Sequence, residues 1–209
     1  MHHEPTQASQ TAGRVIHWAR WYDFFVGAIP FVRAIREKLV ELAAPAPGEH
    51  VLDVGCGTGT LAIALKSRVG SGKVHGIDAS PEMITVAKKK AAKASLDVDF
   101  QIALIEALPF PDASFNLVTS SLMLHHLPDD LKRRALAQIR RVLQPGGRFM
   151  ALDFAAHSHS PLGHLLAVFG HARGESTVAM LTPLLKEAGF SDVDAIPTRH
   201  KSFAFIRAR

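Results

Sequence analysis

Three alternate glycines, Gly55, Gly57 and Gly59, follow the short run Val51–Val54, whose residues are apolar except for Asp53. Because glycine has no Cβ, its backbone can adopt positive φ and approach a ligand closely. A helix that begins directly after such a loop leaves backbone N–H groups without intrahelical partners, and these groups can bind a small molecule. The segment therefore predicts a buried strand, a ligand-binding loop and a helix.

A second carboxylate, Asp78, lies about 20 residues after the glycine loop, which is the distance at which an acidic residue can accept both hydroxyls of a ribose. Leu104 and Ile105 follow the third expected strand, and Ser120–Ser121 ends the fourth. Ligands of open α/β sheets bind beyond the carboxyl ends of the strands. Together these residues predict a nucleoside site.

A dinucleotide site is the first alternative, because Gly57–Ala62 can be aligned with the pattern G-x-G-x-x-A and Asp78 with the ribose carboxylate. Three features oppose it: Asp53 near the end of the first strand, the additional Gly55, and the lack of a second mononucleotide-binding half after residue 154.

Alternating strands and helices must position these residues. The hydrophobic pattern predicts helices at 14–26, 30–43, 61–68, 81–94, 130–143 and 177–188, and strands at 51–54, 74–78, 98–102, 115–120, 148–153, 193–196 and 202–207. Gln144–Gly147 should end one helix and turn into the fifth strand. We expect a seven-stranded, mostly parallel sheet with one antiparallel strand and with helices on both faces.

Composition favours a single domain over residues 1–209, since 47% of the 209 residues are apolar. The segment 1–13 is expected to be disordered, and neither a signal peptide nor a membrane span is predicted. The single cysteine, Cys56, fits a reducing, cytoplasmic location. The net charge of +5 comes from scattered basic residues, so we expect no nucleic-acid partner.

Five sequence blocks occur in an order and at a spacing that resemble the class I S-adenosylmethionine-dependent methyltransferases, and most closely the ubiquinone/menaquinone-biosynthesis C-methyltransferases. The blocks are Val51–Gly59, Gly76–Met83, Leu108–Phe115, Leu124–Leu127 and Leu143–Gly147. The resemblance covers about residues 15–209. It implies a Rossmann-like class I methyltransferase fold and S-adenosylmethionine as cofactor.

The resemblance also implies roles for matched residues. Gly55, Gly57 and Thr58 would line the methionine part of the cofactor, beside Cys56 and Gly59 of the same loop, and Asp53 would lie near its ammonium group. Asp78 would hold the ribose, Ala79 and Met83 would flank the adenine, Leu104 and Ile105 would lie at the adenine edge, and Ser121 would lie near the sulfonium.

The chain departs from the family pattern at two positions. Relatives usually carry Asp or Asn at the position of Leu104 to accept a hydrogen bond from the adenine amino group, which leucine cannot do. We hypothesise that a water, a backbone carbonyl or Glu106 replaces this acceptor, because an unpaired buried amino group would cost about 1–3 kcal/mol. Asn116 stands where many relatives have Asp, and no consequence follows from the sequence.

A base would assist methylation of a carbon or phenol acceptor, which must lose a proton. His125 and His126 are the preferred catalytic candidates, and one of them should face the cleft; His17, Tyr22 and Asp153 are alternatives. The aromatic residues Trp18, Trp21, Tyr22 and Phe25, on the N-terminal helices within 14–44, and the apolar segment 155–175 are expected to cover the active site as substrate-binding lids. The histidines of that segment, His157, His159, His164 and His171, fit no defined metal site, so no metal is expected.

The sequence thus predicts a methyltransferase for a small, apolar or aromatic molecule, acting as a monomer or homodimer without stable membrane insertion. Two alternatives stay open. One is a cofactor-binding scaffold without catalytic activity, which the leucine at position 104 favours. The other is an RNA methyltransferase, which would normally carry an Asn-Pro-Pro-Tyr type motif or an additional basic module.

Overall fold

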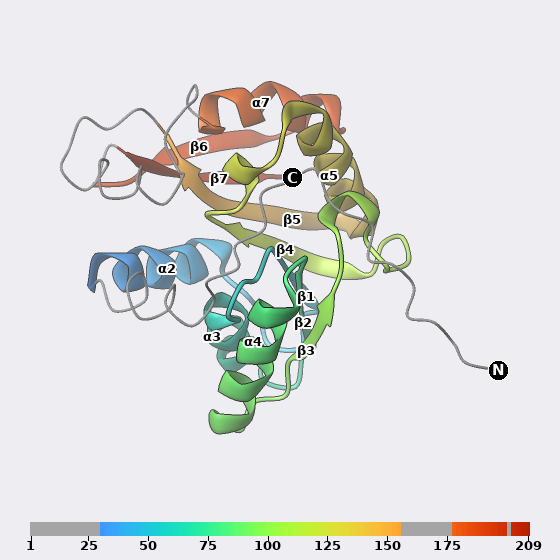
Figure 1. Cartoon of the computed structure of the whole chain (residues 1–209). Coiled ribbons are helices and arrows are strands. Elements are labelled where there is room, and N and C mark those ends of the chain that lie inside the picture. The colour runs from blue at the N-terminus through green and yellow to red at the C-terminus, as the bar shows by residue number, and fades with distance from the viewer. Residues whose placement is uncertain (1–29, 156–176, 200–201) are drawn as a thin grey trace.

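A computed structural model describes residues 30–155, 177–199 and 202–209. Its centre is a seven-stranded sheet in the order β3-β2-β1-β4-β5-β7-β6 (Figure 1). The strands are β1 (Val51–Val54), β2 (Val74–Asp78), β3 (Asp99–Ile102), β4 (Phe115–Ser121), β5 (Leu143–Phe154), β6 (Val193–Pro197) and β7 (Phe203–Ala208). Only β7 runs antiparallel to its neighbours, β5 and β6, so the predicted topology is confirmed.

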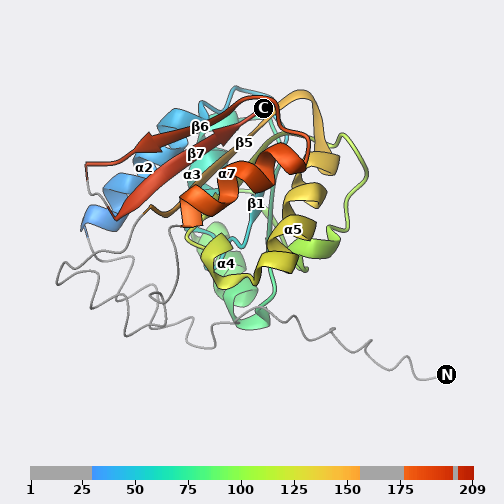
Figure 2. The ribbon, with the colours of Figure 1, turned by 90° about the horizontal axis from the view of Figure 1, so that it is seen from above.

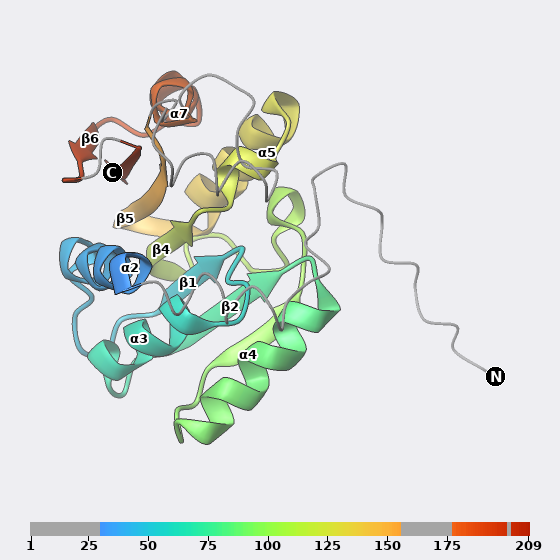
Figure 3. The same cartoon turned by 60° about the vertical axis from the view of Figure 1, so that its left-hand side comes forward.

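Helices cover both faces of this sheet. They are α2 (Pro30–Ala43), α3 (Thr60–Val69), α4 (Pro81–Lys93), α5 (Asp129–Val142) and α7 (Thr177–Glu187), with short 3-10 turns η2 (Ile105–Ala107) and η3 (Leu124–His126). In Figure 3, α2, α3 and α4 lie on one side of the sheet, and α5 and α7 lie on the other. Figure 2 shows α5 and α7 on the same face from above.

Two hydrophobic cores hold the layers together, because neighbouring residues of a strand point to opposite faces. Leu52 and Val54 of β1 pack with α5 and α7, whereas Val51 packs with α2, α3 and α4. Burial of Ile35 and Leu39 fits the helical period predicted for α2.

The local sequence explains where α4 begins. Ser80 has an extended backbone and its hydroxyl accepts a 3.3 Å hydrogen bond from the N–H of Met83, while Pro81 occupies the first turn. The helix therefore begins three residues after Asp78, and this carboxylate is held at the carboxyl end of β2.

The start of β5 differs from its prediction. Gln144–Gly147 belongs to the strand rather than to a preceding turn, because Leu143 already pairs with Phe115 of β4. The register then shifts, and the next pair is Leu117 with Arg148. Asn116 stabilises this irregular start: its side chain donates to Gln144 Oε1 at 2.8 Å and accepts from the N–H of His50 at 2.9 Å. The other bounds agree with the prediction to within one residue, and the helix predicted at 14–26 lies outside the described residues.

An ion pair fixes the end of α2 to β5. Arg148 contacts both carboxylate oxygens of Glu49 at 2.8 Å, and its guanidinium also donates to the carbonyls of Ala43 and Ala44 at 2.8 Å. These carbonyls end α2, where backbone acceptors lack intrahelical donors.

Among the described helices, none has the length and apolar character needed to cross a bilayer.

Candidate active site

The glycine loop between β1 and α3 forms the floor of a pocket at the carboxyl ends of the strands. Gly55, Gly57 and Gly59 have φ values of 65°, 52° and 76°, a region that favours glycine. A Cβ at Gly55 would collide with Met123, whereas a Cβ at Gly57 would meet no atom within 4 Å. Gly57 therefore borders open space, and its positive φ, rather than a close contact, is the reason for a glycine at this position.

Asp78 joins the loop to the end of β2. Its Oδ2 accepts a 2.9 Å hydrogen bond from the N–H of Gly57, and its Oδ1 accepts one of 2.9 Å from the N–H of Ser80. Burial raises the pKa of this carboxyl, and the two backbone hydrogen bonds oppose the shift. Each carboxylate oxygen can accept a further hydrogen bond, which suits a pair of ligand hydroxyls.

Asp53, at the end of β1, is only 1% exposed. Burial raises its pKa to about 7, whereas a 2.9 Å hydrogen bond from Thr119 Oγ1 and the positive charge of Arg36 act in the opposite direction. A buried carboxylate in a pocket attracts a cation, because a cationic ligand would compensate its desolvation.

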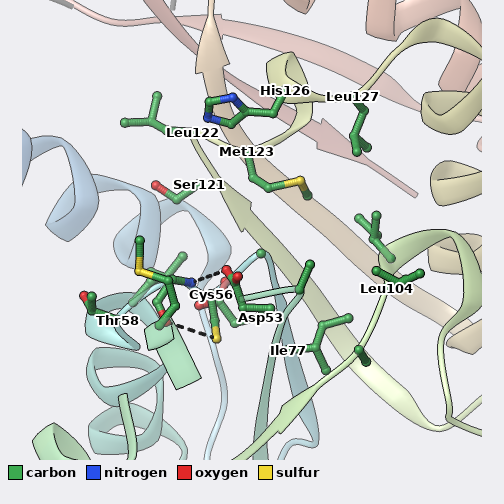
Figure 4. Close-up of a pocket in the computed structure, with 18 of the residues that line it drawn as sticks. Asp53, Cys56, Thr58, Ile77, Leu104, Ser121, Leu122, Met123, His126 and Leu127 are labelled. Atoms are coloured by element: carbon green, nitrogen blue, oxygen red, sulfur yellow. Dashed lines mark hydrogen bonds between the residues drawn. The ribbon is translucent and has the colours of Figure 1, made fainter. Parts of the chain in front are cut away.

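Apolar side chains and a buried hydroxyl complete the pocket. Figure 4 shows Asp53, Cys56 and Thr58 on one side, Ile77 and Leu104 on another, and Met123, His126 and Leu127 opposite the loop. The buried Ser121 Oγ has no hydrogen-bond partner among the described residues and lies on the pocket wall. A ligand with a cationic end, a sugar diol and a flat apolar part would satisfy these groups.

The two histidines after β4 have different environments. His126 lines the pocket. His125 is 8% exposed at its side chain, and its Nδ1 lies 2.8 Å from Oδ1 of Asp153, which is 1% exposed. Asp153 also accepts hydrogen bonds from the backbone N–H groups of His125, at 3.3 Å, and Phe154, at 2.8 Å. The ring centroids of His125 and His126 lie 4.0 Å apart. Because Asp153 binds both the ring and the backbone of His125, it fixes the turn that presents His126.

Most of the predicted cofactor residues line this one pocket. They are Asp53, Gly55, Cys56, Gly57, Thr58, Asp78, Ala79, Met83, Leu104, Ile105 and Ser121. Gly59 is not on the described wall; it is the N-cap of α3, and a Cβ there would collide with Phe100 and Ala87. Burial of Cys56 raises the pKa of its thiol well above the usual value, which opposes a role as nucleophile.

Sequence reasoning missed several pocket residues. They are Arg36, Thr60, Leu61, Ile77, Ala103, Leu122, Met123 and Leu127. Adjacency to predicted strand ends could have indicated Ile77, Ala103 and Leu122. Arg36 gave no such signal, because it lies on a helix whose position over the loop depends on tertiary packing.

The expected substrate residues Trp18, Trp21, Tyr22 and Phe25 lie outside the described residues, as does all of the lid segment 155–175 except Ala155. The four lid histidines are outside them as well. In the part of the chain that the structure describes, no three His, Cys, Asp or Glu side chains are grouped to hold a metal ion.

Comparison with known proteins shows what this chain is similar to. Residues 51–147 match the family model described as a methyltransferase domain. The demethylmenaquinone methyltransferase of Thermus thermophilus is 37% identical over 134 residues, which are 64% of this chain and 60% of that protein. The ubiquinone/menaquinone biosynthesis C-methyltransferase of Bdellovibrio bacteriovorus is 40% identical over 119 residues, 57% of this chain and 50% of that protein.

An arsenite methyltransferase of Halobacterium salinarum is 37% identical over 169 residues, 78% of this chain and 42% of that protein. The chain thus spans 42% to 60% of the length of these three relatives. Solved structures share the fold: an S-adenosylmethionine-dependent methyltransferase from Aquifex aeolicus has a TM-score of 0.68 at 23% identity and covers 83% of this chain and 88% of its own. The PH0226 protein of Pyrococcus horikoshii has a TM-score of 0.72 at 18% identity, covering 94% and 99%.

Proposed function

We propose that this chain, which carries a class I S-adenosylmethionine-dependent methyltransferase domain similar to those of the quinone C-methyltransferases, transfers the methyl group of that cofactor to a small, apolar or aromatic molecule. One observation supports this most strongly: two carboxylates, the buried Asp53 and the partly buried Asp78, flank the glycine loop in a pocket whose other walls are mostly apolar.

The pocket offers a group for each part of the donor. Asp53 would bind the ammonium, the loop from Gly55 to Gly59 would pack against the methionine chain, and Asp78 would accept the two ribose hydroxyls. Ala79, Met83, Leu104 and Ile105 would surround the adenine, and Ser121 would lie near the sulfur. When bound, the donor would supply a methyl group attached to a positively charged sulfur. The acceptor would form its bond to the methyl carbon, and the electron pair of the broken C–S bond would stay on the sulfur.

The chain's own contribution is to hold the acceptor behind the methyl carbon and to exclude water, which supplies much of the rate for a good nucleophile. His126 would take a proton from a carbon or phenol acceptor, and its position on the pocket wall opposite the loop supports this role. His125 and Asp153 would keep His126 in position.

The walls around His126 favour an apolar acceptor, since Leu122, Met123 and Leu127 lie on the same side of the pocket. Relatives named for demethylmenaquinone, for ubiquinone/menaquinone biosynthesis and for aklanonic acid also support an aromatic acceptor. Arsenite fits less well, because the chain has one cysteine, Cys56, and burial keeps its thiol protonated. A cytoplasmic location and a monomeric or homodimeric state stay predictions from the sequence.

Incubation with S-adenosylmethionine labelled at the methyl group, a fractionated cell extract and a panel of hydroxylated quinone precursors would test the proposal. Label should enter the lipid or aromatic small-molecule fraction with wild-type protein and should be lost with Asp78→Ala. Label in RNA alone would replace the proposal by RNA methylation. Donor binding without label in any fraction would favour a scaffold.

The role of His126 has its own test. With a phenol or carbon acceptor, His126→Ala should lower kcat about 10²- to 10⁴-fold while leaving donor affinity within about threefold, which is the range expected for loss of a general base. Asp153→Asn should lower kcat less, because it acts through the turn. Unchanged kcat in His126→Ala between pH 6 and 9 would remove this residue from the mechanism.

A further inference from the structure

The glycine loop and the start of α3 have few local restraints. Gly55, Gly57 and Gly59 each lose more conformational freedom on folding than other residue types do. Gly59 is the N-cap of α3 and provides no side-chain acceptor for the first turn, which also contains no acidic residue. By contrast, the hydroxyl of Ser80 caps α4. The shape of the glycine loop therefore depends on contacts from other elements.

One such contact comes from Lys90, in the last turn of α4. Its Nζ donates hydrogen bonds to Thr60 Oγ1, at 2.6 Å, and to Thr58 Oγ1, at 3.2 Å. These two threonines stand on either side of Gly59, and both line the donor pocket. A single ammonium group therefore joins the end of the loop and the first residue of α3 to a different helix.

Lys90 is absent from the described wall of the donor pocket, but it lines an adjoining cavity that shares Thr60 and Leu61 with that pocket. Thr58 is 4% exposed and Lys90 is half-buried, so the contact between them is partly shielded from water. Helices α3 and α4 lie side by side (Figure 3), and α4 also carries Met83 of the pocket wall. The contact thus connects two walls of the donor pocket.

The charge of Lys90 is not placed to stabilise α3. The first N–H groups of a helix give its N-terminus a partial positive charge, which favours anions and disfavours cations. Because Lys90 brings an ammonium group to the first residue of α3, this repulsion offsets part of the gain from its hydrogen bonds. We therefore expect Lys90 to affect the shape of the loop more than the overall stability of the fold.

We propose that Lys90 is a positioning residue for donor binding, which keeps the glycine loop in its binding shape by holding the hydroxyls of Thr58 and Thr60. The inference rests on the proposed function and extends it to a residue outside the described pocket wall. A loop that is already ordered loses less conformational entropy when a ligand binds, which raises affinity without a new ligand contact.

Lys90→Met removes the ammonium group and keeps a long, unbranched side chain. In calorimetric titrations it should weaken the binding of S-adenosylmethionine and S-adenosylhomocysteine by the same factor, about 5- to 20-fold, as expected for one or two lost hydrogen bonds. In turnover, KM for the donor should rise by a similar factor while kcat changes less than about twofold, because the bound donor orders the loop. Lys90→Arg should recover part of the lost affinity.

A double-mutant cycle tests whether Lys90 acts through the threonines. Thr60→Val removes the acceptor of the 2.6 Å hydrogen bond. Because the two changes remove the same contact, the combined variant should bind the donor within about twofold of the weaker single variant. If the two losses multiply in full, Lys90 does not act through Thr60 and the inference is wrong.

Lys89→Met is the matched control, since Lys89 is the exposed neighbour of Lys90 in the same helix and carries the same charge. Hydrogen exchange of the amides in 55–61, measured without donor, should be at least about fivefold faster in Lys90→Met than in wild type or Lys89→Met. The urea midpoints of all three proteins should stay close together. Unchanged exchange and affinity in Lys90→Met, or equal changes in Lys89→Met, would overturn the inference.

The outcomes also separate this inference from the proposed function. Wild-type protein that binds neither adenosyl compound would overturn the proposed function, and the inference with it. Donor binding by wild type that is unchanged in Lys90→Met would overturn the inference alone. If Lys90→Met does not fold, Lys90→Gln gives the same comparison.

Discussion

At the scale of single residues, Asp53 connects burial, charge and ligand binding. Its raised pKa of about 7 means that the carboxyl is partly protonated at neutral pH in the unliganded protein, although the donor's ammonium requires the ionised form. We therefore expect donor affinity to be about tenfold weaker at pH 6 than at pH 8. Calorimetric titration across this range measures it, and a flat profile in wild-type protein would contradict the assignment.

Asp53→Asn separates binding from stability. Because the pKa of Asp53 is raised in the folded state, its contribution to stability is fully present below its ordinary pKa of 3.8 and is lost as pH rises towards about 7. Replacing the carboxylate with a neutral amide should thus raise the unliganded protein's resistance to urea at pH 8 more than at pH 5, while donor affinity falls. If Asp53→Asn instead destabilised the protein more at pH 8 than at pH 5, the buried charge of the Asp53 carboxylate would not lower the stability of the fold.

The position of Leu104 makes a separate prediction about the adenine. Glu106 also lines the pocket, two residues further on within η2, and is a candidate for the missing acceptor. Glu106→Ala should weaken donor affinity about tenfold, and Leu104→Asp should strengthen it, because each changes the number of acceptors for the amino group by one. If calorimetry finds the affinity unchanged in both variants, neither side chain position faces the adenine amino group.

At the scale of elements, the end of α2 depends on Arg148. Its side chain joins β5 to Glu49 and to two carbonyls at the end of the helix. The hydrogen bonds that Arg148 donates to Glu49 lower the pKa of this carboxyl. Arg148→Met should cost about 1–3 kcal/mol of unfolding free energy, since it leaves the partly buried carboxylate of Glu49 with only the N–H of Ala46 as a donor and removes the side-chain donor of two carbonyls. Urea titration at pH 7 and at pH 4 measures this.

The difference between variant and wild type should shrink at the lower pH. Glu49 has a lowered pKa in the folded state, so the stability it contributes is present above its ordinary pKa and is lost as pH falls through the folded value. An equal loss at both pH values would indicate that packing, rather than the ion pair, explains the effect. Arg133→Met is a matched control, because its ion pair with Glu187 is exposed on both sides.

The elements also show what a sequence can and cannot predict. The bounds of α2 and β1 agree with the prediction, because apolar periodicity and punctuating residues are local signals. The prediction of a turn at Gln144–Gly147 was wrong. Pro and Gly in sequence favour a turn, and only the position of the neighbouring strand shows otherwise: here Leu143 already pairs with Phe115 of β4. Arg36 was missed for a related reason: its side chain meets the loop only after α2 has packed.

The candidate site was predictable where motif and topology coincide. Asp53 and Asp78 stand at the ends of adjacent parallel strands, so their proximity follows from the fold. The contact between His125 and Asp153 could not be predicted, since it depends on the conformation of the η3 turn. It also separates two neighbouring histidines that look equivalent in the sequence, because His125 is bound to Asp153 while His126 lines the pocket.

At the scale of the whole molecule, the donor should stabilise the fold as one unit. The pocket is built from β1, β2, β4, α2 and η3, which belong to both cores, so a ligand there opposes unfolding of both faces of the sheet. At a donor concentration about 100-fold above Kd, binding adds about 3 kcal/mol, which raises the Tm of a domain of this size by roughly 5–10 °C. Differential scanning calorimetry should show a single shifted transition, and NAD should not produce this shift.

We propose that Asp53, Asp78 and the glycine loop bind S-adenosylmethionine rather than a dinucleotide. Calorimetric titration of wild-type protein and Asp78→Ala with S-adenosylmethionine, S-adenosylhomocysteine and NAD tests it directly. Wild-type protein should bind both adenosyl compounds saturably and one to one, and it should not bind NAD. The variant should bind the adenosyl compounds at least tenfold more weakly, as expected for lost charge-assisted hydrogen bonds. Tight binding of NAD with no heat from either adenosyl compound would contradict it.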